Sequence, residues 1–174
     1  MNLAPANLLD VRFPDEVAEL LARTGVPPEL LQLEITEDTI MVDPVRVLDV
    51  VARLGELGLA FALDDFGTGY SSLAYLKRLP VQELKIDRSF VTDMDASRDD
   101  AVIVQSTIDL ARNLGLQVIA EGVETEETWA RLEQFGCHGA QGYFLSPPLP
   151  SGELTAWLAG HPEASDPAAS QPGT

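Results

Sequence analysis

Two adjacent aspartates, Asp64 and Asp65, are the residues whose types and spacing most directly suggest chemistry in this sequence. They follow an apolar stretch that ends at Leu63 and lead into the glycine-rich segment Phe66-Gly67-Thr68-Gly69. Neighbouring carboxylates repel each other unless a cation lies between them, and a pair of bound divalent ions is a common arrangement of this kind. Glycines and hydroxyls in the following loop allow a phosphate group to approach closely. The pair therefore indicates a metal site beside a phosphate-binding loop.

Other interpretations of this segment compete with the metal site. A turn after a strand also favours Asp and Gly for backbone reasons, so this segment alone does not distinguish a metal site from an ordinary turn. A kinase-like interpretation of Asp65-Phe66-Gly67 fails, because no glycine-rich phosphate loop or His-Arg-Asp segment accompanies it. The only histidines are His138 and His161, so a histidine-based hydrolase is hard to build. Cys137 is the only cysteine, which excludes an intrachain disulfide and favours a small buried thiol.

The same pattern of an apolar strand followed by a polar side chain recurs along the chain. Strands are expected at residues 30–35, 59–63, 84–86, 117–120 and 139–140, and amphipathic helices at 14–24, 43–58, 100–114 and 125–135. The polar residues that accompany the strands are Glu34, Asp64 with Asp65, Lys85 with Asp87, Glu121, and Gln141. A half-buried strand with one wet face explains one such case but not five consecutive ones.

Strands that alternate with helices of this length predict an α/β fold with a parallel sheet. Ligands of such sheets bind beyond the carboxyl ends of the strands, which is where these polar residues gather. Because parallel strands are covered on both faces, charged groups at their ends are expected to meet each other, a metal or a ligand.

Composition limits the classes of partner. The net charge of −17 repels phosphodiesters unless cations intervene, so a DNA or RNA duplex is not expected as a ligand. The sequence has no leader-like start and no apolar run long enough for a membrane span, so we expect a cytoplasmic protein without membrane insertion. Residues 161–174 are rich in Ala, Pro, Ser and Asp and are expected to be a disordered tail after a domain at 1–160.

From residue 2 to about residue 158 the sequence resembles the EAL family, the metal-dependent phosphodiesterases of cyclic di-GMP, a bacterial second messenger. The family's motifs occur in order as Asn2-Leu3-Ala4, Leu33-Glu34-Ile35-Thr36-Glu37, Asp64-Asp65-Phe66-Gly67-Thr68-Gly69-Tyr70-Ser71-Ser72-Leu73, Leu84-Lys85-Ile86-Asp87, Ala120-Glu121-Gly122-Val123-Glu124 and Gln141-Gly142-Tyr143. The resemblance implies a TIM-like (β/α)8 barrel. The Glu-Ala-Leu segment of the first strand is absent, and a whole barrel needs about 250 residues where this chain has 174. We therefore expect an incomplete barrel that lacks about the first two strands.

The resemblance also implies the chemistry, which is hydrolysis of one phosphodiester of cyclic di-GMP with two Mg²⁺ or Mn²⁺ ions. The metal ligands it implies are Asn2, Glu34, Asp64, Asp65 and Glu121, with Asp64 shared between the ions. Lys85 would orient the attacking water, and Glu121 is the second catalytic candidate. Residues that would contact substrate or support the site are Glu37, Asp87, Glu124 and Gln141. Glu37 would accept hydrogen bonds from the hydroxyls of residues 68–72, and Asp87 and Glu124 could equally cap the following helices. The resemblance further implies a homodimer formed through residues 68–79 (Thr68 to Leu79).

Three functional classes follow from these observations. The first is a phosphodiesterase whose site is competent but separated from its first strands, and the second is a silent relative that binds nucleotide or a partner protein. The third class is an enolase-like barrel that abstracts protons, and the sequence of the loop after Asp65 argues against it. Because every other site residue is present, the first class is preferred. We expect this chain alone to be inactive and to associate through exposed sheet edges, and we expect Met1 not to be the natural start of the polypeptide.

Overall fold

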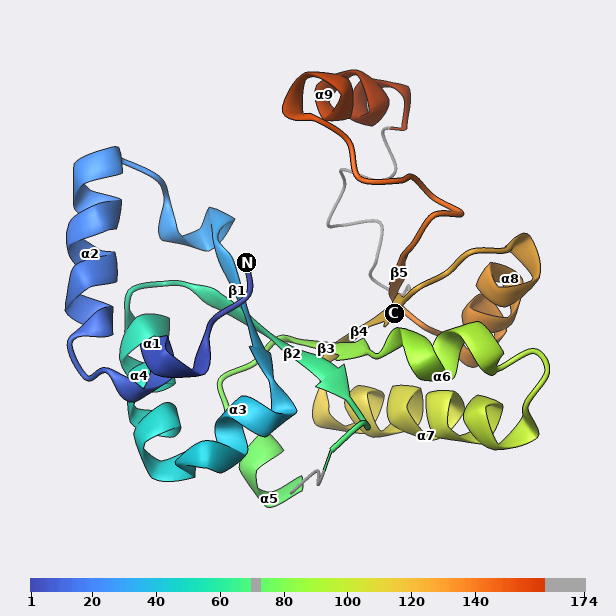
Figure 1. Ribbon diagram of the computed structural model, residues 1–174, viewed down its shortest axis with the longest axis horizontal. Coiled ribbons are helices and arrows are strands. Elements are labelled where there is room, and N and C mark those ends of the chain that lie inside the picture. Colours follow the sequence, from blue (N-terminus) through green and yellow to red (C-terminus); the bar gives the residue numbers. More distant parts are fainter. Residues whose placement is uncertain (70–72, 162–174) are drawn as a thin grey trace.

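The protein, seen here as a computed structural model that describes residues 1–69 and 73–161, is built on one parallel β-sheet (Figure 1). Its five strands lie side by side in chain order: β1 (Gln32–Thr36), β2 (Ala60–Phe66), β3 (Glu83–Ile86), β4 (Gln117–Glu121) and β5 (Gly139–Gln141). Every neighbouring pair is parallel. The predicted α/β class and each of the five predicted strands are confirmed.

Helices alternate with these strands along the chain. The described helices are α1 (Pro5–Leu9), α2 (Phe13–Thr24), the 3₁₀ turn η1 (Pro28–Leu30), α3 (Glu37–Val42), α4 (Pro44–Glu56), α5 (Leu73–Leu76), α6 (Arg88–Asp93), α7 (Arg98–Leu114), α8 (Glu126–Phe135) and α9 (Ser151–Gly160). The four predicted helices correspond to α2, α4, α7 and α8. Helix α9 and the short helices, most of which have one or two turns, were not predicted.

Side-chain caps explain where the long helices begin. The Asp43 carboxylate accepts from the Arg46 N–H before α4, the Ser97 hydroxyl accepts from the Asp100 N–H before α7, and the Thr125 hydroxyl accepts from the Thr128 N–H before α8. Helices α2, α7 and α8 each end at a glycine in the left-handed region. These local signals are readable in sequence, which is why the long helices were predictable.

Helices pack in two groups against the sheet. Figure 1 shows α1, α2 and α4 on the side of β1, and α6, α7 and α8 on the side of β4 and β5. Helix α7 contacts β3 and β4, and α6 contacts β4. Large apolar side chains fill the space between the layers, and Leu33, Phe61, Leu84 and Ile86 are almost completely buried there. Helix α9 stands apart beyond β5, and none of its residues is buried. The packed core thus fixes the strands whose ends carry the polar residues.

The sheet does not close into a barrel within the described residues. Outside β1, residues 1–3 add only a single parallel bridge between Asn2 and Glu34. The Leu3 N–H donates to the Glu34 carbonyl at 2.9 Å, and the Glu34 N–H donates to the Met1 carbonyl at 2.9 Å. This partial sixth strand brings Asn2 next to the end of β1.

The prediction of a domain at residues 1–160 and a tail at 161–174 can be compared with the structure only as far as residue 161. Residues 1–160 carry all the described helices and strands, and His161 caps the end of α9. Residues 162–174 of the predicted tail lie outside the described residues, so the tail stays a prediction. In the described part of the chain, no helix combines the length and the apolar character that crossing a membrane requires.

Candidate functional site

Lys85 on β3 lies at the centre of a group of carboxylates. Its Nζ is 2.9 Å from Glu34 Oε1 on β1, 3.4 Å from Asp64 Oδ1 on β2 and 2.5 Å from Glu121 Oε1 on β4. The Lys85 side chain is almost fully buried, and the three carboxylates are largely so. Four neighbouring strands therefore bring one ammonium group and three carboxylates together. The sequence pattern predicted that charged groups at the strand ends would meet.

Burial and ion pairing act in opposite directions on these charges. Burial disfavours the charged ammonium, but hydrogen bonds to Glu121 and Glu34 outweigh it and raise the pKa of Lys85 above its ordinary value. Burial raises the pKa of Glu121, although its contact with Lys85 opposes the change. Lys85 therefore stays positively charged at neutral pH and holds the carboxylates together.

A second feature is the close approach of three carboxylates. One oxygen each from Asp64, Asp65 and Glu121 can lie within 4.8 Å of the others. Asp65 has a φ of +55°, and it is the only non-glycine residue with positive φ in the described part of the chain. Such a backbone is strained and often marks a functional site. The Asp65 N–H also donates to Asp64 Oδ1 at 3.1 Å.

The electrostatics of this cluster fit a hard divalent cation. Burial and the neighbouring Asp64 carboxylate raise the pKa of Asp65, which means that its charged form is disfavoured without a counter-charge. Carboxylate and amide oxygens are the ligands that Mg²⁺ and Mn²⁺ prefer. The donor set of Asp64, Asp65 and Glu121 therefore suits such an ion.

Glu34 and Asn2, the other predicted metal ligands, are paired through the bridge beside β1. The Met1 amino group lies 3.9 Å from Glu34 Oε2, so a second positive charge faces this carboxylate. The Glu34 side chain is also bound to Lys85 and thereby to Asp64 and Glu121. The structure thus brings Glu34 to the cluster and places Asn2 on the adjoining backbone.

Glu37 is the first residue of α3, directly after β1, and it is only 5% exposed. Its Oε2 accepts a hydrogen bond from the Gly67 N–H at 3.4 Å, and its Oε1 is buried without a partner among the described residues. The Thr68 hydroxyl donates to the Asp65 carbonyl instead, and the predicted donors Ser71 and Ser72 lie outside the described residues. The Glu37 carboxylate therefore contacts the backbone of the loop that follows Asp65.

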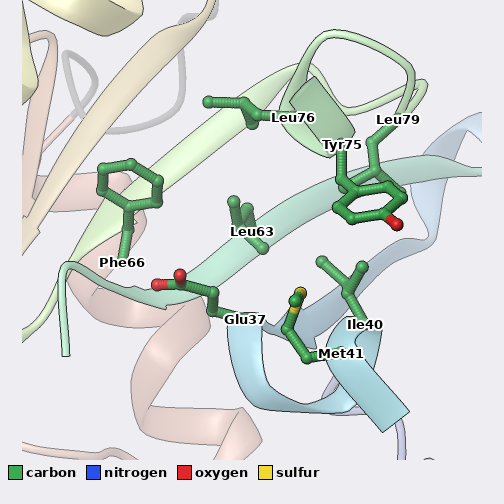
Figure 2. Close-up of a pocket in the computed structure, with 8 residues that line it drawn as sticks. All are labelled: Glu37, Ile40, Met41, Leu63, Phe66, Tyr75, Leu76 and Leu79. Atoms are coloured by element: carbon green, nitrogen blue, oxygen red, sulfur yellow. The ribbon is translucent and has the colours of Figure 1, made fainter. Parts of the chain in front are cut away.

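An apolar cavity adjoins the stem of Glu37. Figure 2 shows its carboxylate pointing toward Phe66 and away from the apolar side chains of α3 and α5. The other lining residues are Ile40, Met41, Leu63, Tyr75, Leu76 and Leu79. The loop after β2 is thus joined to α3 by a polar contact, and α5 is joined to α3 by an apolar one.

The remaining predicted residues lie around the ends of β3, β4 and β5. The Asp87 carboxylate accepts hydrogen bonds from the Ser89 N–H and hydroxyl, and these bonds outweigh burial and lower its pKa. Asp87 therefore caps α6, whereas α8 is capped by Thr125 and not by Glu124. Glu124 and Gln141 line a cavity together with Glu121.

Sequence reasoning missed one charged residue of this region. Arg88 lines the same cavity as Glu121, Glu124 and Gln141. The available signal was its position, since Arg88 directly follows Asp87 at the carboxyl end of a predicted strand.

Comparison with known proteins agrees with this arrangement. A family model described as the EAL domain matches residues 1–148. The cyclic di-GMP phosphodiesterase NbdA of Pseudomonas aeruginosa is 45% identical over 158 residues, which cover 91% of this chain and 20% of NbdA. The chain thus spans about a fifth of the length of such curated relatives.

Solved structures give the same result. The cyclic di-GMP complex of the MucR phosphodiesterase, a Pseudomonas aeruginosa protein, has a TM-score of 0.84 at 43% identity and covers 88% of this chain and 62% of that one. The calcium and cyclic di-GMP complex of Klebsiella pneumoniae BlrP1 has a TM-score of 0.77 at 33% identity and covers 84% of this chain and 38% of that one. With the family model matching most of its length, the chain belongs to the EAL domain family.

Proposed function

We propose that this site belongs to a metal-dependent phosphodiesterase that hydrolyses cyclic di-GMP to the linear dinucleotide. The observation that carries the proposal is the convergence of Glu34, Asp64, Asp65, Lys85 and Glu121 at the carboxyl ends of four parallel strands. Ligand sites of α/β folds occupy this end of the sheet. Two relatives are named as cyclic di-GMP phosphodiesterases, which supports this substrate.

The proposed ligand sets follow the two groups of oxygens. Asp64, Asp65 and Glu121 would hold one divalent ion, while Asn2, Glu34 and Asp64 would contribute to the other, so that Asp64 serves both. Two such ions lower the pKa of a bound water and stabilise the attacking and leaving oxygens of an in-line displacement. Lys85 would hold the carboxylates in place and orient the water through its Nζ. Glu37 would keep the loop after Asp65 in position, and Glu124 and Gln141 would contact the substrate.

We propose further that the 174-residue chain turns over slowly or not at all by itself. Its described sheet has five strands, whereas the barrel of this fold has the (β/α)8 form. The alternative is a silent module that binds cyclic di-GMP or a partner protein.

Product analysis tests this proposal. Cyclic di-GMP is incubated with the chain in Mg²⁺ or Mn²⁺, and the linear dinucleotide is measured by chromatography. We expect slow, metal-dependent product formation, well below the roughly 1 per second of an ordinary enzyme, and none in excess chelator. Turnover at an ordinary enzymatic rate would contradict the proposed inactivity. No product, together with binding of the nucleotide in chelator, would favour the silent module.

The proposal includes a homodimer formed through residues 68–79 and the neighbouring α3. Met41 and Val42 on α3 are 41% and 62% exposed, and Met41 lines the apolar cavity between α3 and α5 (Figure 2). Exposed apolar side chains next to such a cavity are typical of a protein interface.

Sedimentation velocity tests this surface. We expect Met41→Asp to shift the chain from dimer to monomer, because a charge at the interface would lose its water without a partner. Val102→Asp on α7 is the matched control, since Val102 is 54% exposed on another helix, and it should leave the dimer intact. A Met41→Asp variant that stays dimeric would exclude this surface. The cytoplasmic location and the absence of nucleic-acid binding remain predictions from composition.

A further inference from the structure

A cavity of about 280 Å³ lies beside the proposed metal cluster, between the start of α6 and the ends of β4 and β5. Its charged side chains are Arg88, Glu121 and Glu124, and the Tyr143 ring forms part of its wall. Sites for drug-sized ligands have volumes of about 300–1,000 Å³. The cavity is therefore suited to one part of a cyclic dinucleotide, such as a single base.

The backbone of Arg88 is held firmly at this place. Asp87 caps α6 just before it, and the loop after β4 passes directly over it at Gly122. A Cβ on Gly122 would come within 2.6 Å of the Arg88 Cβ, and Gly122 has a φ of +72°. Only glycine allows this close approach. The Cα and Cβ of Arg88 thus lie against the loop that directly follows Glu121.

The guanidinium of Arg88 has no ion-pair partner among residues 1–69 and 73–161. Glu121 and Glu124 line the same cavity, but neither forms an ion pair with Arg88. The guanidinium of Arg88 can donate hydrogen bonds to a ligand, and the nearby carboxylates can accept them. A ligand with acceptors on one edge and donors on another would therefore fit this cavity.

Guanine has this arrangement of edges. Its O6 and N7 both accept hydrogen bonds and match the planar fork of an arginine, and its N2 amino group donates to a carboxylate. The neighbouring N1–H is also a donor. Adenine has an amino group where guanine has O6. This amino group is a hydrogen-bond donor and would face the guanidinium, which also only donates. The exposed ring of Tyr143 offers a surface on which a base can stack.

We propose that Arg88 is a specificity residue that binds O6 and N7 of one guanine of the cyclic dinucleotide, with Glu124 on the donor edge of that base. This inference rests on the proposed function, and it adds how the site recognises guanine. The alternative is that Arg88 binds a phosphate of the nucleotide, and the experiment is designed to distinguish these two contacts.

The test measures binding of cyclic di-GMP and of its 7-deazaguanine analogue to the full chain by calorimetry in Ca²⁺, an ion present in the BlrP1 nucleotide complex. The analogue lacks N7 and keeps both phosphates. We expect the parent chain to prefer cyclic di-GMP. We expect Arg88→Ala to weaken cyclic di-GMP binding by about 10- to 100-fold and to bind the two ligands with nearly equal affinity. Arg23→Ala is the matched control, because it removes the same charge from an exposed position on α2, and it should behave as the parent.

Each outcome decides a defined claim. If Arg88→Ala binds cyclic di-GMP as tightly as the parent, the inference is wrong while the proposed function stands. If Arg88→Ala binds weakly but still prefers cyclic di-GMP over the analogue, Arg88 contacts a phosphate and the guanine assignment is wrong. If the parent chain itself binds no cyclic di-GMP, the proposed function fails and the inference fails with it.

Discussion

Replacing Asp64 by Asn is expected to remove divalent-metal binding and to abolish any turnover of cyclic di-GMP. Asp64 is 8% exposed, its carboxylate lies with those of Asp65 and Glu121, and it is also 3.4 Å from Lys85. The substitution keeps the shape of the side chain but removes the charge that both proposed ions share. Residues that only support a metal ligand change metal affinity by about 10- to 100-fold, so loss of the shared ligand should weaken Mn²⁺ binding by more than this.

Calorimetric titration with Mn²⁺ measures this effect. Asp49→Asn is the matched control, because Asp49 is exposed on α4 and the substitution changes the net charge equally. The control should bind Mn²⁺ as the parent does. If Asp64→Asn also binds Mn²⁺ with parental affinity, Asp64 is not a metal ligand and the assignment of both sites is wrong.

Replacing Lys85 by Met is expected to have the second large effect, on both activity and stability. Without metal, the variant leaves Glu34, Asp64 and Glu121 close together with no cation between them. Removal of one partner from a buried ion pair costs about 3–5 kcal/mol, so the free energy of unfolding in chelator should fall by roughly this amount. Turnover should fall while nucleotide binding in metal persists, since binding and water activation are separable.

Urea unfolding with and without Mg²⁺ measures the stability effect. A metal that binds only the folded state stabilises it by mass action, so Mg²⁺ should restore more stability to Lys85→Met than it adds to the parent. Lys77→Met is the control, because Lys77 is exposed and is the only other lysine in the chain. Equal stability of Lys85→Met and the parent in chelator would mean that the ion pairs of Lys85 contribute nothing to folding.

Much of the fold was predictable because its signals are local. Asp43 before Pro44, the glycine after each of α2, α7 and α8, and the apolar strand segments can be read one element at a time. The short helices carry weaker signals. In particular, no helix was predicted between the first strand and residue 43, but α3 begins at Glu37, directly after Thr36.

The candidate site was predictable to a similar degree. Parallel strands place their carboxyl ends on one edge, so Glu34, Asp64, Lys85 and Glu121 could be expected to meet. The left-handed backbone of Asp65 could not be expected, because non-glycine residues rarely adopt it. The closeness of Arg88 to Gly122 is also beyond sequence reasoning, since it depends on how α6 packs against the loop after β4.

The measurement that tests the central claim most directly is the affinity of the chain for cyclic di-GMP in Ca²⁺ and in excess chelator. The central claim is that the carboxylates around Asp64 bind divalent cations and that these cations hold the anionic nucleotide in a chain whose net charge is −17. Because phosphodiesters are repelled by this charge, we predict clear binding in Ca²⁺ and at least a hundredfold loss, of about 2.7 kcal/mol, in chelator. Equal affinity in both conditions would contradict the metal site and identify the chain as a metal-independent nucleotide-binding module.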